Sequence, residues 1–536
     1  MNVPFDPAAV AAPRPLAATL AAMAALDALP PTEAQDAVTY RSGGNTLVIG
    51  PAAEALPLAD YLARGLRVTV LLRGEVPPTE PRTYPVFHAN AVALVGWLGA
   101  FAVRWQETGA AAQQASFDLV LDLGDVPLIA THQPPNGYYA PGPDRTARQA
   151  AADALLEMVG DFEKPRYFSY RERLCAHSRN TLVGCNACVD ICSAGAIAGA
   201  GDNIAVNPYL CAGCGACTTV CPTGALTYAY PTATQMGRRL KTALQAYRAE
   251  GGVDAVVLFH ADDRPADVQP GTIPVALHHV AATGIDLWLA ALAYGAAGVA
   301  VRLTGAEAPQ YAAALEQQMA IAQEVMDGLG YAGPHFALVR GDGAMDWPGG
   351  QVPAPAATFD VAATKRDTLE YALDHLHRHA PMQPQTVSLP AGAPFGAIAL
   401  NTAACTLCMS CVGACPASAL LGGDTLPQLR FVEKNCVQCG LCATTCPEDA
   451  IRLVPRMSFK PTRNQPFVLH GSQPFHCIRC DKPFGTLQMI ETMLAKLGRH
   501  GAFAGNLDRM KMCGDCRVID MMAPQEEMKV IPLRRM

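Results

Sequence analysis

Residues 405–416 read CTLCMSCVGACP, and residues 436–447 read CVQCGLCATTCP. Each stretch places four cysteines with the spacing C-x2-C-x2-C-x3-C, and a proline follows the fourth cysteine. In such a run the first three thiolates converge on one iron–sulfur cluster, whereas the fourth ligates the neighbouring cluster. The two stretches together therefore predict a module with two [4Fe–4S] clusters, and eight cysteines at this spacing argue against a purely apolar role.

This crossed ligation divides the eight cysteines between two clusters. One cluster is expected to bind Cys405, Cys408, Cys411 and Cys446. Its neighbour is expected to bind Cys415, Cys436, Cys439 and Cys442. Each cluster accepts one electron, and paired clusters within one module lie close enough for rapid electron tunnelling, so the pattern is typical of an electron relay.

A second set of eight cysteines lies earlier in the chain and repeats this pattern. Cys185, Cys188 and Cys192 precede their counterparts by 223 residues, and the run Cys211, Cys214, Cys217 and Cys221 precedes its counterpart by 225 residues. These nearly constant offsets indicate an internal duplication of the module. We therefore expect two further [4Fe–4S] clusters, which brings the predicted total to four.

The repeat departs from the pattern at its first ligand. The counterpart of Cys405 is Leu182, which cannot bind iron, so we expect Cys175 to supply the missing thiolate, with His177 as the alternative ligand. Ser193 also replaces the usual proline. The predicted ligand sets are Cys175, Cys185, Cys188 and Cys221 for one cluster, and Cys192, Cys211, Cys214 and Cys217 for the other.

The last four cysteines form two C-x2-C pairs, Cys477 with Cys480 and Cys513 with Cys516. Two such pairs suit a tetrahedral four-cysteine Zn²⁺ site with a structural role. The spacer is longer than usual, but a helix expected over 486–497 brings the pairs together. A further iron–sulfur centre and a redox-active dithiol remain as alternatives.

Two segments without cysteines alternate with the modules and show the βαβ rhythm of α/β domains. Strands are expected over 46–49, 67–72 and 117–123 in the first segment, and over 255–260, 298–303 and 335–339 in the second. The turn after the first strand reads GPAA at 50–53, which lacks the G-x-G-x-x-G fingerprint of dinucleotide-binding folds. A structural or docking role is therefore favoured over nucleotide binding.

The predicted fold is thus a multidomain chain of α/β and α+β parts. It comprises a Rossmann-like domain at 1–165, a dicluster module at 166–229, a second α/β domain at 230–343, a linker at 344–384, a second dicluster module at 385–458 and a zinc-ribbon-like region at 459–536.

The composition narrows the environment and the partners of this chain. The 536 residues carry a formal net charge of −7, which argues against nucleic acid or an anionic membrane as the main ligand. No apolar run is long enough for a transmembrane helix. Twenty cysteines in spaced groups indicate metal ligands in a reducing compartment, and we expect a cytoplasmic protein.

Both modules resemble the two-cluster ferredoxins of bacteria. The segments FEKP at 162–165, CAHSR at 175–179, GC at 184–185, FHC at 475–477 and CGDCR at 513–517 further resemble a family of proteobacterial 4Fe–4S dicluster proteins, which are often encoded beside formate dehydrogenases. The resemblance implies electron transfer between partner redox proteins, with a formate dehydrogenase among the candidates. A cluster-assembly factor and a subunit of an NAD(P)H- or flavin-linked reductase remain as alternatives, and the oligomeric state stays open.

Overall fold

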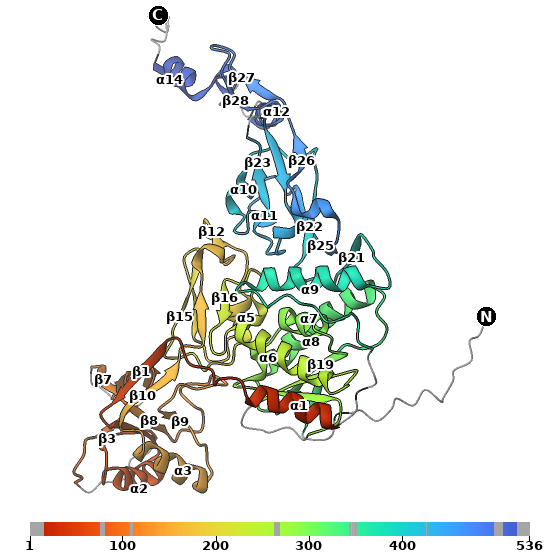
Figure 1. The fold of residues 1–536 in the computed structure, drawn as a ribbon. Coiled ribbons are helices and arrows are strands. Elements are labelled where there is room, and N and C mark those ends of the chain that lie inside the picture. The colour runs from red at the N-terminus through yellow and green to blue at the C-terminus, as the bar shows by residue number, and fades with distance from the viewer. Residues whose placement is uncertain are drawn as a thin grey trace, which may run out of the picture. The chain divides into compact units, whose positions relative to one another are not determined.

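A computed structural model describes residues 16–74, 81–89, 91–107, 111–261, 268–341, 345, 347, 351–424, 426–497 and 507–522. These residues fall into two compact units. The first comprises the chain up to His177 together with Asn186–Val387, and the second comprises Ser178–Cys185 together with the chain from Ser388 onward. Both units combine helices and strands (Figure 1), in agreement with the predicted mixed class.

The first unit contains a parallel sheet of five strands in the order β4-β3-β2-β8-β9. Its strands are β2 (Asn45–Gly50), β3 (Arg67–Leu72), β4 (Val86–His88), β8 (Leu119–Asp122) and β9 (Tyr138–Tyr139). The strands expected over 46–49, 67–72 and 117–123 correspond to β2, β3 and β8. These three predictions are confirmed.

Different structures cover the two faces of this sheet. Val48 packs with the helices α2 (Ala52–Leu62) and α3 (Arg145–Leu156), whereas Leu47 and Ile49 pack with Phe101 and Phe117 of an antiparallel sheet. That sheet consists of β5 (Ala91–Val95), β6 (Phe101–Gln106) and β7 (Gln113–Phe117). Because neighbouring side chains of a strand point to opposite faces, the apolar run of β2 supplies both cores.

A second parallel sheet in the first unit has the order β18-β17-β19-β20. Its strands are β17 (Val256–Ala261), β18 (Thr272–Leu277), β19 (Gly298–Leu303) and β20 (Phe336–Arg340), and its helices include α6 (Ala233–Ala249), α7 (Ile285–Ala293) and α8 (Pro309–Gly328). Every residue of α7 is buried. The strands expected over 255–260, 298–303 and 335–339 are confirmed as β17, β19 and β20.

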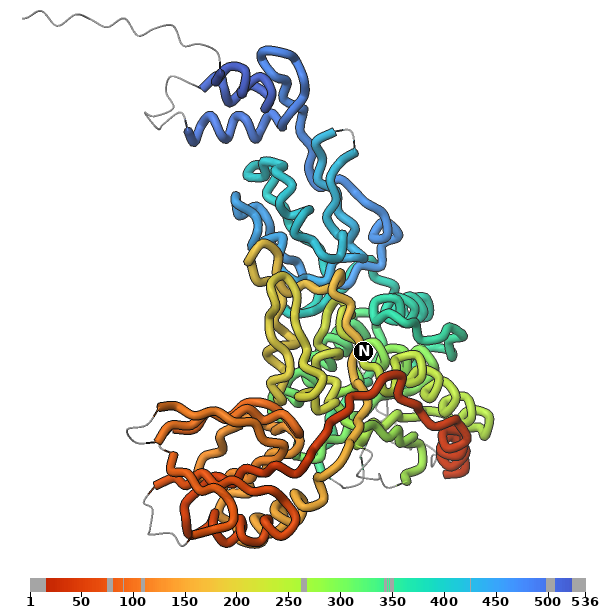
Figure 2. Tube along the Cα trace, turned by 90° about the vertical axis from the view of Figure 1, so that its left-hand side faces the viewer, coloured from red at the N-terminus to blue at the C-terminus, as the bar shows by residue number. Residues whose placement is uncertain are grey.

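Two helices lie where the expected domain limits did not place them. The helix α1 (Leu16–Asp27) packs on α6 of the second α/β domain (Figure 1 and Figure 2), and its Thr19 Oγ1 accepts the Gly271 N–H at 3.0 Å. The helix α9 (Lys365–His379) lies in the expected linker and packs on α7. The apolar spacing of Leu369, Leu373 and Leu376 explains this packing, since these side chains share one helix face.

Short elements build each cysteine-rich module, and they repeat along the chain. In the first unit they are β11 (Phe168–Tyr170), α4 (Ala187–Asp190), β14 (Ile197–Ala200), β15 (Asn203–Val206), α5 (Ala216–Val220) and β16 (Leu226–Tyr228). In the second unit they are β22 (Gly396–Leu400), α10 (Ser410–Ala414), β23 (Leu420–Gly422), β24 (Gln428–Phe431), α11 (Leu441–Thr444) and β25 (Ile451–Ser458). From α4 to β25, corresponding elements begin 223 or 225 residues apart, which matches the cysteine offsets.

The second unit also contains the four-cysteine region at the C-terminal end of the described chain. It comprises the antiparallel pair β27 (Pro474–His476) and β28 (Pro483–Thr486), followed by α12 (Leu487–Leu497), α13 (Leu507–Met510) and α14 (Gly514–Met522). The helix α12 confirms the expectation for 486–497. Hydrogen bonds join its first turn to the dicluster module, since Gln488 Nε2 donates to the carbonyl oxygens of Thr402 and Ala403 at 3.1 and 3.0 Å.

Candidate metal centres

The cysteine loops of the second unit turn sharply between their cysteines. Leu407 and Met409, on either side of Cys408, have φ values of +55° and +62°. A left-handed conformation costs a side-chain-bearing residue roughly 1–2 kcal/mol, and such strain is typical of ligand-binding loops. Backbone turns of this kind point successive N–H groups into one concavity, where they stabilise anionic sulfur.

Two cavities in the second unit reproduce the predicted ligand sets. One cavity of about 370 Å³ is lined by Cys405, Cys408, Cys411 and Cys446. Another of about 370 Å³ is lined by Cys415, Cys436, Cys439 and Cys442. Each cavity thus draws three cysteines from one run and the fourth from the other. Four thiols around an otherwise apolar cavity fit a [4Fe–4S] cluster, which is larger than a single ion and holds its thiolates farther apart.

The cavities change the acid–base properties of their thiols. Burial raises the pKa of Cys411 and Cys442 to about 12, and neighbouring thiols add to the effect. Burial likewise raises the pKa of Cys439 to about 11, with smaller contributions from Cys415, Cys436 and Cys185. Free thiols here therefore keep their protons at neutral pH. Binding of a cluster must displace these protons, because iron binds the thiolate.

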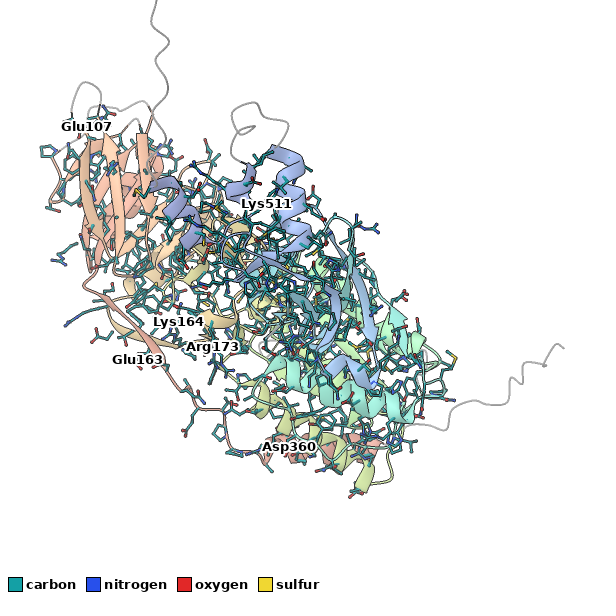
Figure 3. The ribbon with its side chains drawn as sticks, turned by 90° about the horizontal axis from the view of Figure 1, so that it is seen from above. Glu107, Glu163, Lys164, Arg173, Asp360 and Lys511 are labelled. Carbon is teal, nitrogen blue, oxygen red and sulfur yellow. The ribbon has the colours of Figure 1, made fainter. Side chains whose placement is uncertain are left out.

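In the first unit, one predicted set of four cysteines is brought together. Burial raises the pKa of Cys217 far above its usual value, followed by the effects of Cys214, Cys211 and Cys192. Lys164, labelled in Figure 3, lies on β10 (Gly160–Pro165), and its Nζ donates to the Cys211 carbonyl oxygen at 2.7 Å. Burial lowers the pKa of Lys164 to about 8, against the opposing effect of the Cys211 thiol.

The remaining set is brought together only in part. Cys175, Cys188 and Cys221 share one buried core of the first unit, whereas Cys185 belongs to the segment grouped with the second unit. The Tyr170 side chain hydrogen-bonds Cys175. The His177 Nε2 atom instead lies against Gly199, where an added Cβ atom would be 2.7 Å away. The core position of Cys175 supports this residue as the fourth ligand.

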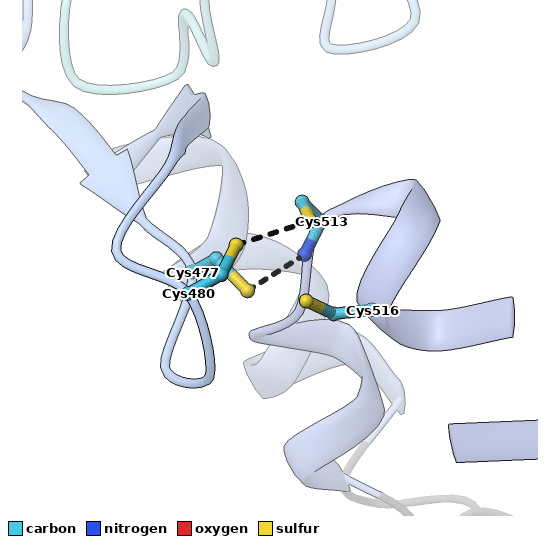
Figure 4. A group of neighbouring side chains, drawn as sticks. All are labelled: Cys477, Cys480, Cys513 and Cys516. Atoms are coloured by element: carbon cyan, nitrogen blue, oxygen red, sulfur yellow. Dashed lines mark hydrogen bonds between the residues drawn. The ribbon is translucent and has the colours of Figure 1, made fainter. Parts of the chain in front are cut away.

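The four C-terminal cysteines form one compact group (Figure 4). Their sulfur atoms all lie within 4.8 Å of one another. Cys480 Sγ lies 3.6 Å from Cys513 Sγ, and the backbone N–H of Cys513 donates to Cys477 Sγ at 3.2 Å. Although burial opposes the change, this donor and the N–H groups of Arg479 and Cys480 lower the pKa of Cys477 to about 6. The spacing and the thiolate character fit a single tetrahedral metal ion.

The structure adds polar residues that the cysteine pattern did not reveal. Lys164 is one of them, and Tyr311 of α8 is another, since its hydroxyl lies 3.0 Å from Cys214 Sγ. Burial raises the pKa of Tyr311, and the Cys214 thiol adds to this shift, so the phenol stays protonated. The one signal in the sequence was Ser193 in place of proline, because its hydroxyl contacts Tyr311.

Comparison with known proteins supports the two modules. A family model described as a 4Fe–4S dicluster domain matches residues 183–225, and another with the same description matches residues 404–451. No curated protein matches the chain. The chain therefore contains two 4Fe–4S dicluster domains, which implies iron–sulfur clusters as cofactors. Among the helices that the structure describes, none has the length and apolar character required to cross a membrane.

Proposed function

We propose that the chain relays single electrons through four [4Fe–4S] clusters between partner redox proteins. The observation that carries this proposal is the pair of cavities in the second unit, each lined by three cysteines of one run and one of the other. Bound clusters supply reversible one-electron chemistry. The protein contributes the thiolates, the apolar surroundings that fix the dielectric, and the backbone N–H groups that stabilise the sulfur atoms.

We place an electron port at Cys408. Its side chain is exposed, whereas Cys405 and Cys411 of the same set are buried and Cys446 is half-buried. Electron transfer between proteins requires one cluster edge near the surface, and an exposed ligand supplies it. The partner is a redox protein, and a formate dehydrogenase is a candidate through the family resemblance of the segments around Cys175 and Cys513.

We propose that the two α/β domains are Rossmann-like docking and scaffolding domains. By position along the chain, the first sheet has its strands in the order third, second, first, fourth, fifth, which is the doubly wound order. The second sheet has the order second, first, third, fourth. The first strand–helix turn has Pro51 beside Gly50 instead of the glycine-rich phosphate loop, so a docking role is favoured over nucleotide binding.

The relay predicts a defined cofactor content and a reversible response. Protein purified without oxygen should contain about sixteen iron and sixteen sulfide per chain, as four cubane clusters require. A low-potential reductant such as dithionite should add about four electrons, and an oxidised partner should remove them without loss of iron. Transfer of intact clusters to an apo-enzyme would instead support an assembly factor. Bleaching by NADH, or bound flavin, would support a reductase subunit.

The proposed ligand Cys175 can be tested against His177. Cys175→Ala should convert or lose one cluster, because the thiolate is removed from the core that holds Cys188 and Cys221. His177→Ala is the matched control and should keep all iron, since its Nε2 lies against Gly199. Iron analysis and EPR spectra of the reduced proteins measure both variants. An unchanged spectrum for Cys175→Ala with a changed one for His177→Ala would reverse the assignment.

A further inference from the structure

The hydroxyl of Tyr311 contacts a predicted cluster ligand. Tyr311 lies in the first turn of α8, its side chain is 1% exposed, and its hydroxyl lies 3.0 Å from Cys214 Sγ. The ring packs among Ile191, Ala216 and Ala281, and the His279 ring meets it edge-on with 5.4 Å between centroids. The phenol is therefore fixed beside the sulfur atom.

Two further polar side chains hold this hydroxyl. Ser193 Oγ contacts the Tyr311 hydroxyl and donates to Gln133 Oε1 at 2.9 Å. Gln133 lies in the first α/β domain, Ser193 in the dicluster module and Tyr311 in the second α/β domain. The network depends on Ser193, because a proline at this position, like Pro416 in the second module, has no hydroxyl. Both α/β domains thus contribute to the surroundings of one cysteine.

The hydrogen atoms of this network can be placed by counting donors and acceptors. Ser193 and Tyr311 each have one hydroxyl hydrogen, and the Ser193 hydrogen is directed to the Gln133 carbonyl oxygen. The Tyr311 hydrogen is then free for Cys214 Sγ. A thiolate carries negative charge, and hydrogen bonds to charged acceptors are stronger than those between neutral groups. The Tyr311 hydroxyl therefore donates to the Cys214 sulfur when this sulfur ligates iron.

The second module provides an internal comparison. Cys439 is the counterpart of Cys214, and it accepts the N–H of Leu441 just as Cys214 accepts that of Ala216. Within the described part of the chain, no side-chain hydroxyl is found on the Cys439 sulfur. The Tyr311 contact is therefore the particular difference between two otherwise equivalent ligands.

We propose that Tyr311 raises the reduction potential of the cluster at Cys192, Cys211, Cys214 and Cys217. This inference rests on the proposed function, since it requires a cluster at these cysteines. A hydrogen bond to a ligand sulfur withdraws negative charge and so stabilises the reduced cluster, which holds the additional electron. The α/β domains would thereby make the two modules electronically unequal, which gives electron flow along the chain a direction.

The test is a redox titration followed by EPR on the full-length holoprotein. Tyr311→Phe should shift one midpoint potential to a more negative value and leave the other three, together with the iron content, unchanged. Cys214→Ser identifies the affected cluster, because it should alter the same EPR signal. Tyr331→Phe is the matched control, since it removes another buried tyrosine hydroxyl, bonded to the Leu376 carbonyl oxygen at 2.7 Å, and should shift no potential.

Ser193→Ala provides a second variant if Tyr311→Phe loses iron. It keeps the tyrosine but removes its support, so the same midpoint should move in the same direction by a smaller amount. Four clusters with unchanged midpoints in the available variants would overturn the role of Tyr311 while leaving the relay intact. Wild-type protein without iron–sulfur clusters would instead overturn the proposed function itself.

Discussion

Cys446→Ala is expected to abolish the [4Fe–4S] signal of the cluster at Cys405, Cys408 and Cys411, although Cys446 belongs to the other cysteine run. The reason is geometric, because Cys446 lines the cavity of that set rather than the cavity of its own neighbours Cys439 and Cys442. Iron analysis should show the loss of up to four of about sixteen iron atoms, or EPR should show conversion to a three-iron cluster.

Double variants reveal which cluster each cysteine serves. Cys446→Ala combined with Cys408→Ala should lose no more than one cluster, because both residues line the same cavity. Cys446→Ala combined with Cys439→Ala should lose two clusters, because these residues line different cavities. The matched single variant Cys415→Ala should remove the cluster that Cys446→Ala leaves intact.

The opposite pattern would contradict crossed ligation. If Cys446→Ala and Cys439→Ala together removed one cluster only, each run would have to hold its own cluster. This outcome would leave two clusters in the module and hence the relay as such. It would change the path, however, because crossed ligands connect each cluster covalently to the loop of its neighbour.

The cysteine runs were predictable from sequence because their function depends on local spacing. Three thiolates within seven residues converge through the backbone of one loop, so the pattern itself encodes the geometry. The strands β2, β3 and β19 were predictable for a similar reason, since short β-branched and apolar runs suit buried parallel strands. In each case local sequence and final structure agree.

Features that depend on distant packing were not predictable. The apolar spacing of Leu16, Leu20 and Met23 suggested one buried face of α1, but the structure buries Ala18, Thr19 and Ala22 and leaves Leu16 and Leu20 about half exposed. Small residues allow this helix to lie close to α6. The helix α9 was similarly obscured by the Pro- and Gly-rich composition of its surroundings. The proximity of Tyr311 to Cys214 spans 97 residues and has no local signature.

The four C-terminal cysteines provide the second large expected effect. We propose that they hold one Zn²⁺ ion, and Cys513→Ser should release it and unfold the region around β27, β28 and α14. The buried core of this region consists of Cys477, Cys513 and Cys516 with only Phe484 and Met512 packed against them. So small a core contributes little, whereas binding of a structural zinc ion contributes on the order of 10–16 kcal/mol.

Metal analysis and limited proteolysis measure this effect. Cys513→Ser should lose one zinc per chain, keep all iron and gain cleavage sites within 474–522. Lys482→Ala is the matched control, because it breaks the exposed ion pair with Asp515 at 3.2 Å, which joins the same two segments. Such surface pairs contribute about 0–1 kcal/mol, so zinc content and protease resistance should persist. Loss of iron instead of zinc in Cys513→Ser would make the site a further iron–sulfur centre, and unchanged metal content with altered thiol reactivity would make it a redox-active dithiol.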